Sequence, residues 1–416
     1  MNDHVQAAHS IGEEVNLFVR HVDSLRETLP MTMMVMQLMG DDLAKKLEAF
    51  EGENCTVAHV ENGRKVSIPL EHIRRWNRMK SKHDQVDLAR KLIPRSILVS
   101  LVSQYDAFLG RLLRMIFLSR PELLNASERT LTFAQAASFD SIEAMREHVI
   151  EKEVEGVLRS SHADHFKWME NRFSVTLTKG VDIWPQFIEL TERRNLFVHA
   201  DGVVSNNYLT TCKQNGVALD PLLHEGTPLG VPQDYFVESY RCIFELGMKL
   251  AHVLWRKLLP DEREAADSNL IAATYELIER EEYPIAITLL TFACETIKNH
   301  ASEWHLLAFV VNRAQAFKWS GKEADCLRVL EKYDWSAKGD EFKIADAVLR
   351  GEWLKSAEIM QRIGSNGPVK KLNYRDWPLF REFRLRSEFL TAYEQVFGEP
   401  FPSKVTADTE QSPREI

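Results

Sequence analysis

Apolar positions recur at helical spacing along most of the chain. Between 93 and 118 they follow one another at intervals of three or four residues, which predicts a long helix with one buried face. Pro121 is expected to end that helix. The same spacing predicts helices over 182–198 and 235–258, and Gly247 lies on the apolar face of the latter. This glycine either lets a neighbouring helix approach closely or is simply tolerated.

One segment departs from the helical pattern. Residues 55–70 read CTVAHVENGRKVSIPL, with β-branched runs on both sides of Asn62-Gly63. That dipeptide favours a type I′ turn, so the segment predicts a small β-hairpin. The predicted fold class is all-α with this single hairpin, and the expected first region, 1–70, is an N-terminal helix followed by the hairpin.

The C-terminal part of the chain contains a degenerate repeat. Segments 280–290, 319–330 and 349–360 each place a turn before an amphipathic helix, at spacings near the roughly 34 residues of a tetratricopeptide (TPR) array. We interpret 265–399 as a domain of TPR-like helical hairpins, with a generic α-helical domain as the alternative. The polar run 261–268 predicts an exposed linker before it, and 400–416 a flexible tail.

Composition narrows the possible classes of protein. With 44% hydrophobic and 27% charged residues, the chain has the values of a globular protein and not of a disordered one. A net charge of −9 excludes a uniformly basic nucleic-acid coat but not a local basic groove. The five cysteines form no C-x-x-C pair, and the first residues lack the features of a signal peptide. A cytoplasmic protein is therefore expected.

Two apolar stretches need to be distinguished from membrane segments. Residues 31–39, MTMMVMQLM, are too few to cross a bilayer. Residues 96–118 are long enough, but they include Asp106, Arg111 and Arg114, which would be costly inside a membrane. We expect both stretches to be core helices and expect no membrane contact.

The most informative motif lies in residues 191–209, which contain Arg194 and His199 in an R-x4-H spacing. Chance alone provides about one such match in a chain of this composition. A second match, Arg78 and His83, lies in a lysine-rich polar run and is expected to be solvated surface. The 194–199 pair instead closes an amphipathic helix.

Helical geometry allows these side chains to converge. Asn195 and His199 are four residues apart and share a face, and the long Arg194 side chain reaches the same place. Arginine suits bidentate contact with a phosphate, and histidine suits proton transfer near neutral pH. The motif therefore predicts a phosphate-sized site.

Residues 193–209, RRNLFVHADGVVSNNYL, resemble the signature of HEPN domains, helical nucleotide-binding proteins many of which are metal-independent ribonucleases. Residues 93–114 are similar to the first long helix of HEPN proteins in bacterial defence and toxin systems. The resemblance covers about 71–258 and implies a HEPN helical bundle over 71–259. It also implies a homodimer that brings two R-x4-H motifs together.

On the family pattern Arg194 and His199 carry catalysis, Asn195 matches the polar residue that follows the arginine, and Asp106 is an auxiliary residue. Two alternatives remain open. Arg194 and His199 would be an ion-paired helix end in a non-catalytic HEPN fold, and Asp106 would be the buried partner of an arginine such as Arg111 or Arg194.

Metal and cofactor chemistry are not expected. His162 and His165 have an H-x-x-H spacing without a third ligand nearby, and no Walker A, GxGxxG, GxSxG, HExxH or zinc-ribbon pattern occurs.

A basic stretch at 74–95 carries a net charge of +6 with one tryptophan inside it, which predicts RNA contacts by Arg74, Arg75, Trp76 and Arg78. A solvated helix face or a subunit contact is the alternative for this stretch.

These observations predict a metal-independent endoribonuclease that cleaves single-stranded RNA and leaves 2′,3′-cyclic phosphate ends, in the role of a bacterial toxin or antiviral defence effector. The expected partners are RNA, a second copy of the chain, and a protein on the C-terminal helices. The alternative is a non-catalytic HEPN dimer that acts as an adaptor through its helical repeats. A third hypothesis is a HEPN toxin paired with a nucleotidyltransferase.

Overall fold

The computed structural model describes residues 10–60, 63–127, 130–179 and 181–402. The described chain is helical apart from one two-stranded sheet, which confirms the all-α class. Backbone contacts divide it into two units, with the boundary between Glu262 and Arg263.

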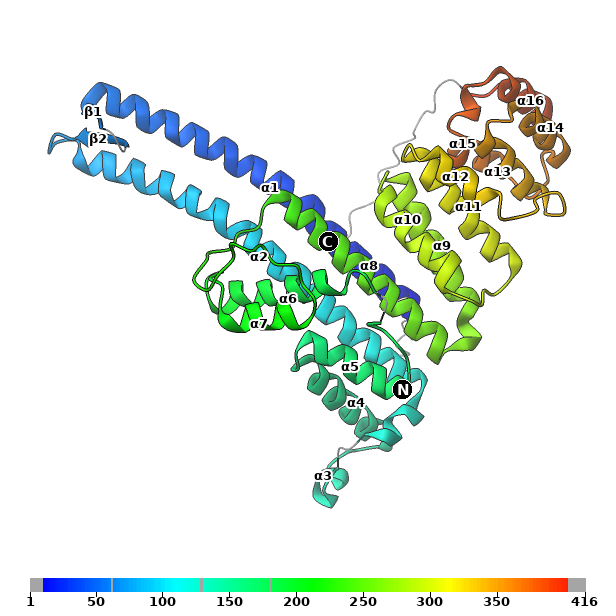
Figure 1. Ribbon diagram of the computed structural model, residues 1–416, viewed down its shortest axis with the longest axis horizontal. Helices are drawn as coiled ribbons and strands as arrows, with labels where there is room; N and C mark the ends of the chain where they lie inside the picture. The colour runs from blue at the N-terminus through cyan, green and yellow to red at the C-terminus, as the bar shows by residue number, and fades with distance from the viewer. Residues whose placement is uncertain (1–9, 61–62, 128–129, 180, 403–416) are drawn as a thin grey trace. The chain divides into compact units, whose positions relative to one another are not determined.

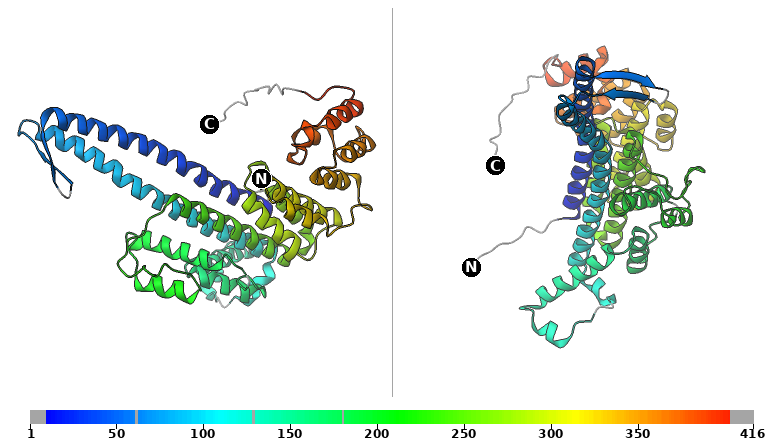
Figure 2. Two further views of the ribbon diagram at one scale, coloured as in Figure 1. Left: turned by 45° about the horizontal axis from the view of Figure 1, so that its top comes forward. Right: turned by 90° about the vertical axis from the view of Figure 1, so that its left-hand side faces the viewer.

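Two long helices form the frame of the first unit. Helix α1 spans Ile11–Asn54 and begins at a capping box in which Ser10 and Glu13 bond each other's backbone. Helix α2 spans Ile73–Ser119, ends before Pro121 as expected, and lies antiparallel beside α1 (Figures 1 and 2). Strands β1 (Thr56–Val60) and β2 (Gly63–Ser67) join the two helices as the predicted hairpin, with Val57 opposite Val66. Asn62 of the predicted type I′ turn lies outside the described residues.

Shorter helices complete this unit: η1 (Pro121–Ala126), α3 (Phe133–Ala137), α4 (Ile142–Leu158), α5 (His162–Phe173), α6 (Trp184–His199), α7 (Asn206–Gln214), α8 (Gln233–Leu258) and η2 (Pro260–Glu262). Of these, η1, α4, α6 and α8 pack on α2, α5 packs on α4 and α6, and α7 packs on α6. Phe18 of α1 and Phe108 of α2 stack with their ring centroids 4.3 Å apart. Helix α8 presents Gly247 to the Phe18 ring at a distance too short for a side chain. The close helix approach considered from the sequence is therefore present.

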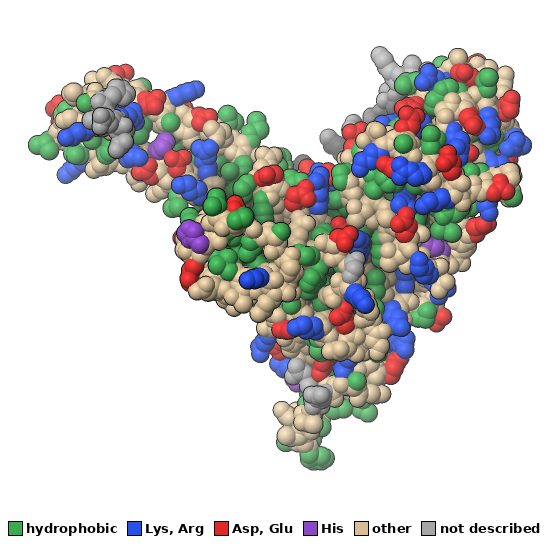
Figure 3. Space-filling model, in the orientation of Figure 1, with side chains coloured by type: hydrophobic (Ala, Val, Ile, Leu, Met, Phe, Trp, Pro, Cys, Tyr) green, Lys and Arg blue, Asp and Glu red, His purple; other side chains and the backbone are tan. Residues whose placement is uncertain are grey.

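The prediction that residues 31–39 form a core helix is wrong. The segment is helical, but Met31, Met34, Val35 and Leu38 are between 52% and 65% exposed. Beyond residue 30, α1 leaves the bundle and continues with α2 and the hairpin as a two-helix arm, on which Figure 3 shows hydrophobic surface. A helix that has only one neighbouring helix can bury only one face. Residues 96–118, by contrast, lie in the core as expected.

The second unit consists of helix pairs. They are α9 (Arg263–Glu279) with α10 (Tyr283–Thr291), α11 (Glu303–Trp319) with α12 (Glu323–Leu330), and α13 (Asp340–Arg350) with α14 (Trp353–Ile363). A residue with positive φ stands two positions before the second helix of each pair: Glu281, Gly321 and Gly351. The three turns are therefore built alike, which agrees with the repeat found in the sequence.

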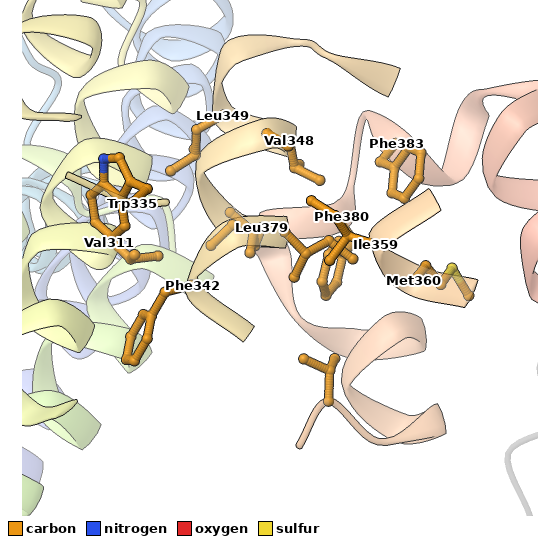
Figure 4. Packing of buried hydrophobic residues seen from close by; sticks show 14 of the residues in the cluster. Val311, Trp335, Phe342, Val348, Leu349, Ile359, Met360, Leu379, Phe380 and Phe383 are labelled. Atoms are coloured by element: carbon orange, nitrogen blue, oxygen red, sulfur yellow. The ribbon is translucent and has the colours of Figure 1, made fainter. Parts of the chain in front are cut away.

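A π-helical turn (Phe292–Thr296) follows α10, and α15 (Lys371–Asp376), the 3₁₀ turns Pro378–Phe380 and Phe383–Leu385, and α16 (Ser387–Phe397) complete the unit. One hydrophobic cluster runs through it from α11 to α16, and Figure 4 shows Val348, Leu379 and Phe380 among its members. None of the described helices is long and apolar enough to span a membrane.

The boundary expected at 261–268 is confirmed, because the two units divide between Glu262 and Arg263, but the run is helical and is not an open linker. Residues 263–268 are the first turns of α9, where Ala266 and Asp267 are fully buried. The Asp267 carboxylate accepts hydrogen bonds from the Ala301 backbone N–H, at 2.6 Å, and pairs with the His300 ring at 3.0 Å. The polar composition of this run predicts solvent exposure throughout, but the Asp267 carboxylate instead bonds the backbone just before α11.

We predict that Gly247→Ala destabilises the first unit. The added Cβ would lie 2.4 Å from a Phe18 ring carbon, so the helices must separate or the ring must move. Such overpacking costs about 1–3 kcal/mol. Gly52→Ala is the matched control, because this glycine also lies in a helix but has no atom within 4 Å of its Cβ position. Urea unfolding followed by circular dichroism should show a loss for Gly247→Ala and a gain of about 0.5–1 kcal/mol for Gly52→Ala. Equal effects would contradict the close packing.

Candidate functional site

Helix α6 carries the R-x4-H motif and is held from two sides. On one side Glu189, which is 8% exposed, accepts hydrogen bonds from the Tyr208 hydroxyl at 2.6 Å and the Tyr235 hydroxyl at 2.7 Å. Arg193 completes this cluster with an ion pair to the same carboxylate at 2.7 Å. Burial and the neighbouring Glu189 charge raise the pKa of Tyr208 and Tyr235, so both hydroxyls remain donors. This cluster fixes α6 to the segments after it.

On the other side of α6, Asp106 of α2 joins three helices. One of its carboxylate oxygens accepts a hydrogen bond from Arg194 at 2.9 Å, and the other lies 2.9 Å from Nε2 of His162, the first residue of α5. The side chains of Asp106 and Arg194 are 24% and 22% exposed, so the ion pair lies at the edge of solvent. Asp106 therefore has the arginine partner considered from the sequence, and that partner is Arg194; Arg111 pairs with Glu14 instead.

The Asp106 pair extends into a polar network. Arg194 donates to the Asn195 side-chain oxygen at 3.0 Å, and the Asn195 amide donates to Glu192 at 3.5 Å. Burial raises the pKa of the Glu192 carboxyl, which favours its protonated form relative to an exposed glutamate. His165 lies behind His162 with ring centroids 5.1 Å apart, and burial lowers its pKa. Within this network the position of the Arg194 guanidinium is set by its hydrogen bonds to Asp106 and Asn195.

His199 ends α6 and is exposed, and no hydrogen bond from its ring occurs among the described residues. The turn after it is firmly held. Arg95 of α2 donates to the backbone carbonyls of Asp201 at 3.1 Å and Leu229 at 3.0 Å, and Gly202 adopts a φ of +79°. An added Cβ at Gly202 would lie 2.9 Å from the Phe197 ring. The imidazole therefore projects from a fixed helix end.

The structure separates the two R-x4-H matches. Arg78 is exposed on the arm, and His83 lies between Asp84 at 3.4 Å and Asp87 at 3.8 Å. Neither residue belongs to a network that joins helices of the bundle. The 194–199 match ends a helix held by Glu189 and by Asp106.

The basic stretch 74–95 lies on the arm, and two of its four predicted RNA-contacting residues already contact other side chains of the protein. Arg74 and Arg78 are exposed, but Arg75 lies over the Phe50 ring, 5.0 Å from its centroid. Trp76 is half-buried and donates its indole N–H to Glu51 at 2.8 Å. The indole also lines a pocket of about 360 Å³ together with Arg64, Lys80 and His83. Stacking on Trp76 would therefore have to take place inside that pocket.

Sequence reasoning missed two members of the site. His162 was considered only with His165 as a metal pair, whereas it bonds Asp106, and Glu192 was not singled out. The available signal was Asp106 itself, because a lone carboxylate on an apolar helix needs buried partners. In the described part of the chain no cluster of three or more His, Cys, Asp or Glu residues is arranged to hold a metal ion.

No family model, no curated protein and no solved structure matches the chain. The function must therefore be argued from the geometry.

We predict energetic coupling between Asp106 and Arg194. In a double-mutant cycle of Asp106→Asn and Arg194→Gln, the coupling should be about 1–2 kcal/mol, since a partly buried charged hydrogen bond is lost only once. The control cycle is Asp42→Asn with Lys46→Gln, an exposed pair 2.7 Å apart on α1. Its coupling should stay below about 0.5 kcal/mol in the same urea titrations. Equal coupling in both cycles would show that Asp106 does not anchor Arg194.

Proposed function

We propose that the chain is a metal-independent endoribonuclease whose site is formed by Arg194, Asn195 and His199. The observation that carries the proposal is that Arg194 is positioned by Asp106 at the edge of solvent, on the same helix as a fixed, exposed imidazole. The resemblance of residues 193–209 to the HEPN signature supports the same assignment.

The roles follow from the chemistry of each side chain. The 2′-hydroxyl of RNA attacks the adjacent phosphorus, the bond to the 5′-oxygen of the next nucleotide breaks, and the products are a 2′,3′-cyclic phosphate and a 5′-hydroxyl. His199 moves a proton in this reaction, because an imidazole changes protonation state near neutral pH. Arg194 stabilises the charge that develops on the phosphorane. Its two terminal nitrogens bond Asn195 and Asp106, and each carries a second N–H that can bond a phosphate oxygen, while Nε is buried.

The remaining residues set the position of Arg194. Asp106 receives Arg194 on one oxygen and His162 on the other, which holds the guanidinium against α2. Asn195 bonds the guanidinium from the following position. The rise from Arg194 to His199 is about 7.5 Å along the helix axis.

We predict that His199→Ala and Arg194→Ala abolish RNA cleavage without unfolding the protein. Loss of an arginine that contacts the transition state should lower the rate by about a hundredfold or more. His83→Ala, the same substitution in the second R-x4-H match, should leave cleavage unchanged. Cleavage of a labelled single-stranded RNA, with circular dichroism as the fold check, measures both. If His199→Ala unfolds the chain, or remains active per folded molecule, His199 is structural.

We also predict that the chain is a homodimer and that chelation does not inhibit it. One motif supplies one imidazole, whereas the acid and base steps are better served by two, so a second copy would complete the site. Light scattering on the full chain at micromolar concentration should give twice the monomer mass of 48.0 kDa. RNA cleavage should be the same with and without EDTA. A monomer that is fully active would contradict the shared site, and loss of activity in EDTA would contradict the metal-free reaction.

A second candidate function is a non-catalytic adaptor, and the apolar stripe on the arm favours it. Met31, Met34, Val35 and Leu38 follow the i, i+3, i+4, i+7 pattern by which a helix docks on another protein. This function predicts that the purified chain does not cleave RNA, whichever variant is used.

A further inference from the structure

The second unit contains a pocket that no part of the proposed reaction uses. It has a volume of about 290 Å³ and is lined from the first helix of each pair: Tyr275 of α9, Trp304 and Asn312 of α11, and Phe342 of α13. Trp377, which follows α15, completes the aromatic lining. The Trp304 and Phe342 rings meet edge to face with centroids 6.1 Å apart. Figure 4 shows Phe342 near Val311, another lining residue.

Two polar groups of this pocket have no partner among the described residues. Asn312 is only 4% exposed, lines the pocket and makes no side-chain hydrogen bond. Glu341 of α13 lines the pocket with a carboxylate that no lysine, arginine or histidine approaches within ion-pair distance. Since buried polar groups are normally satisfied, the Asn312 amide, with the Glu341 carboxylate on the same lining, indicates a missing ligand.

The charge of the lining defines the class of that ligand. Glu341 is the one charged residue in the lining, and no Lys or Arg lines the pocket, so a phosphate or carboxylate group would be repelled. Aromatic faces and a carboxylate together favour a cation with an apolar stem. The volume is at the lower end for small-molecule sites and fits one large side chain.

We propose that this pocket binds an arginine side chain presented by an extended peptide segment of a partner protein. The guanidinium has five N–H donors in a plane, enough to bond both the Glu341 carboxylate and the Asn312 carbonyl oxygen. Trp304 and Phe342 offer aromatic faces and edges to the stem and to the plane of the guanidinium. This site would supply the adaptor function with its ligand, and it does not depend on RNA cleavage.

The test uses the full chain and fluorescein-labelled nonapeptides that differ only at the central residue. The sequence is Gly-Ser-Ala-Ala-X-Ala-Ala-Ser-Gly, with arginine, its neutral isostere citrulline, lysine or norleucine at X. Fluorescence anisotropy measures the dissociation constants. The arginine peptide should bind at least about tenfold more tightly than the citrulline and norleucine peptides, with lysine between them. Added salt should weaken binding of the arginine peptide more than binding of the uncharged citrulline and norleucine peptides.

Two pairs of variants locate the binding. Glu341→Gln should remove the preference for arginine over citrulline, while Glu358→Gln, an exposed glutamate on α14, should not. Trp304→Ala should weaken binding at least about tenfold, while Leu354→Ala, also on α14 and 72% exposed, should not. Circular dichroism spectra confirm that each variant is folded.

Three results would overturn the proposal. They are equal affinities for the arginine and citrulline peptides, no binding of any peptide up to about 1 mM, and Trp304-dependent binding of single-stranded oligouridine instead of peptide. RNA cleavage by the same preparation is measured separately. Failure of peptide binding therefore leaves the ribonuclease proposal intact, and failure of cleavage leaves the peptide site intact.

Discussion

The first unit depends on Asp106, the one carboxylate in the C-terminal half of α2. Asp106 follows the fully buried Tyr105 and lies between α5 and α6, where it bonds His162 and Arg194. Its side chain is only 24% exposed, so the hydrogen bonds to Arg194 and His162 offset the hydration that the carboxylate loses. The bond to Arg194 also holds that arginine at the edge of solvent. The Asp106–Arg194 ion pair therefore both stabilises the packing of α6 on α2 and positions the arginine of the proposed reaction.

The two faces of α6 show how this works. On one face Glu189 bonds Tyr208 and Tyr235, and Arg193 forms an ion pair with the same carboxylate, so Arg193 has a structural role. The opposite face carries Arg194 and Asn195, and its end carries His199. Neighbouring arginines in the sequence thus serve different purposes because successive helical positions point in different directions. The proposed ligand pocket of the second unit follows a related logic, since Asn312 and Glu341 lack the partners that Asp106 and Glu189 have.

Periodicity predicted the elements of the fold well, because helix and hairpin signals are local. It identified the long helix over 93–118, the hairpin and the three turn-and-helix segments of the second unit, whereas at Gly247 it left close helix packing and a tolerated glycine as alternatives. It failed where neighbours decide the outcome. Residues 31–39 are apolar yet largely exposed because this part of α1 extends beyond the bundle. Asp267, in a polar run, is fully buried because its carboxylate bonds the Ala301 backbone. In the site, Arg194 and Asn195 were found by spacing, whereas His162 was not, since its link to Asp106 spans 56 residues.

The chemistry at the ends of the cleaved RNA tests the central claim most directly. A 5′-labelled single-stranded RNA is incubated with the purified full chain in EDTA, and the termini of the fragments are analysed by mass spectrometry. Our account predicts 2′,3′-cyclic phosphate and 5′-hydroxyl ends, since the attacking group is the RNA's own 2′-hydroxyl and His199 and Arg194 act without a metal. Fragments with 3′-hydroxyl and 5′-phosphate ends, or no cleavage at all, would contradict it.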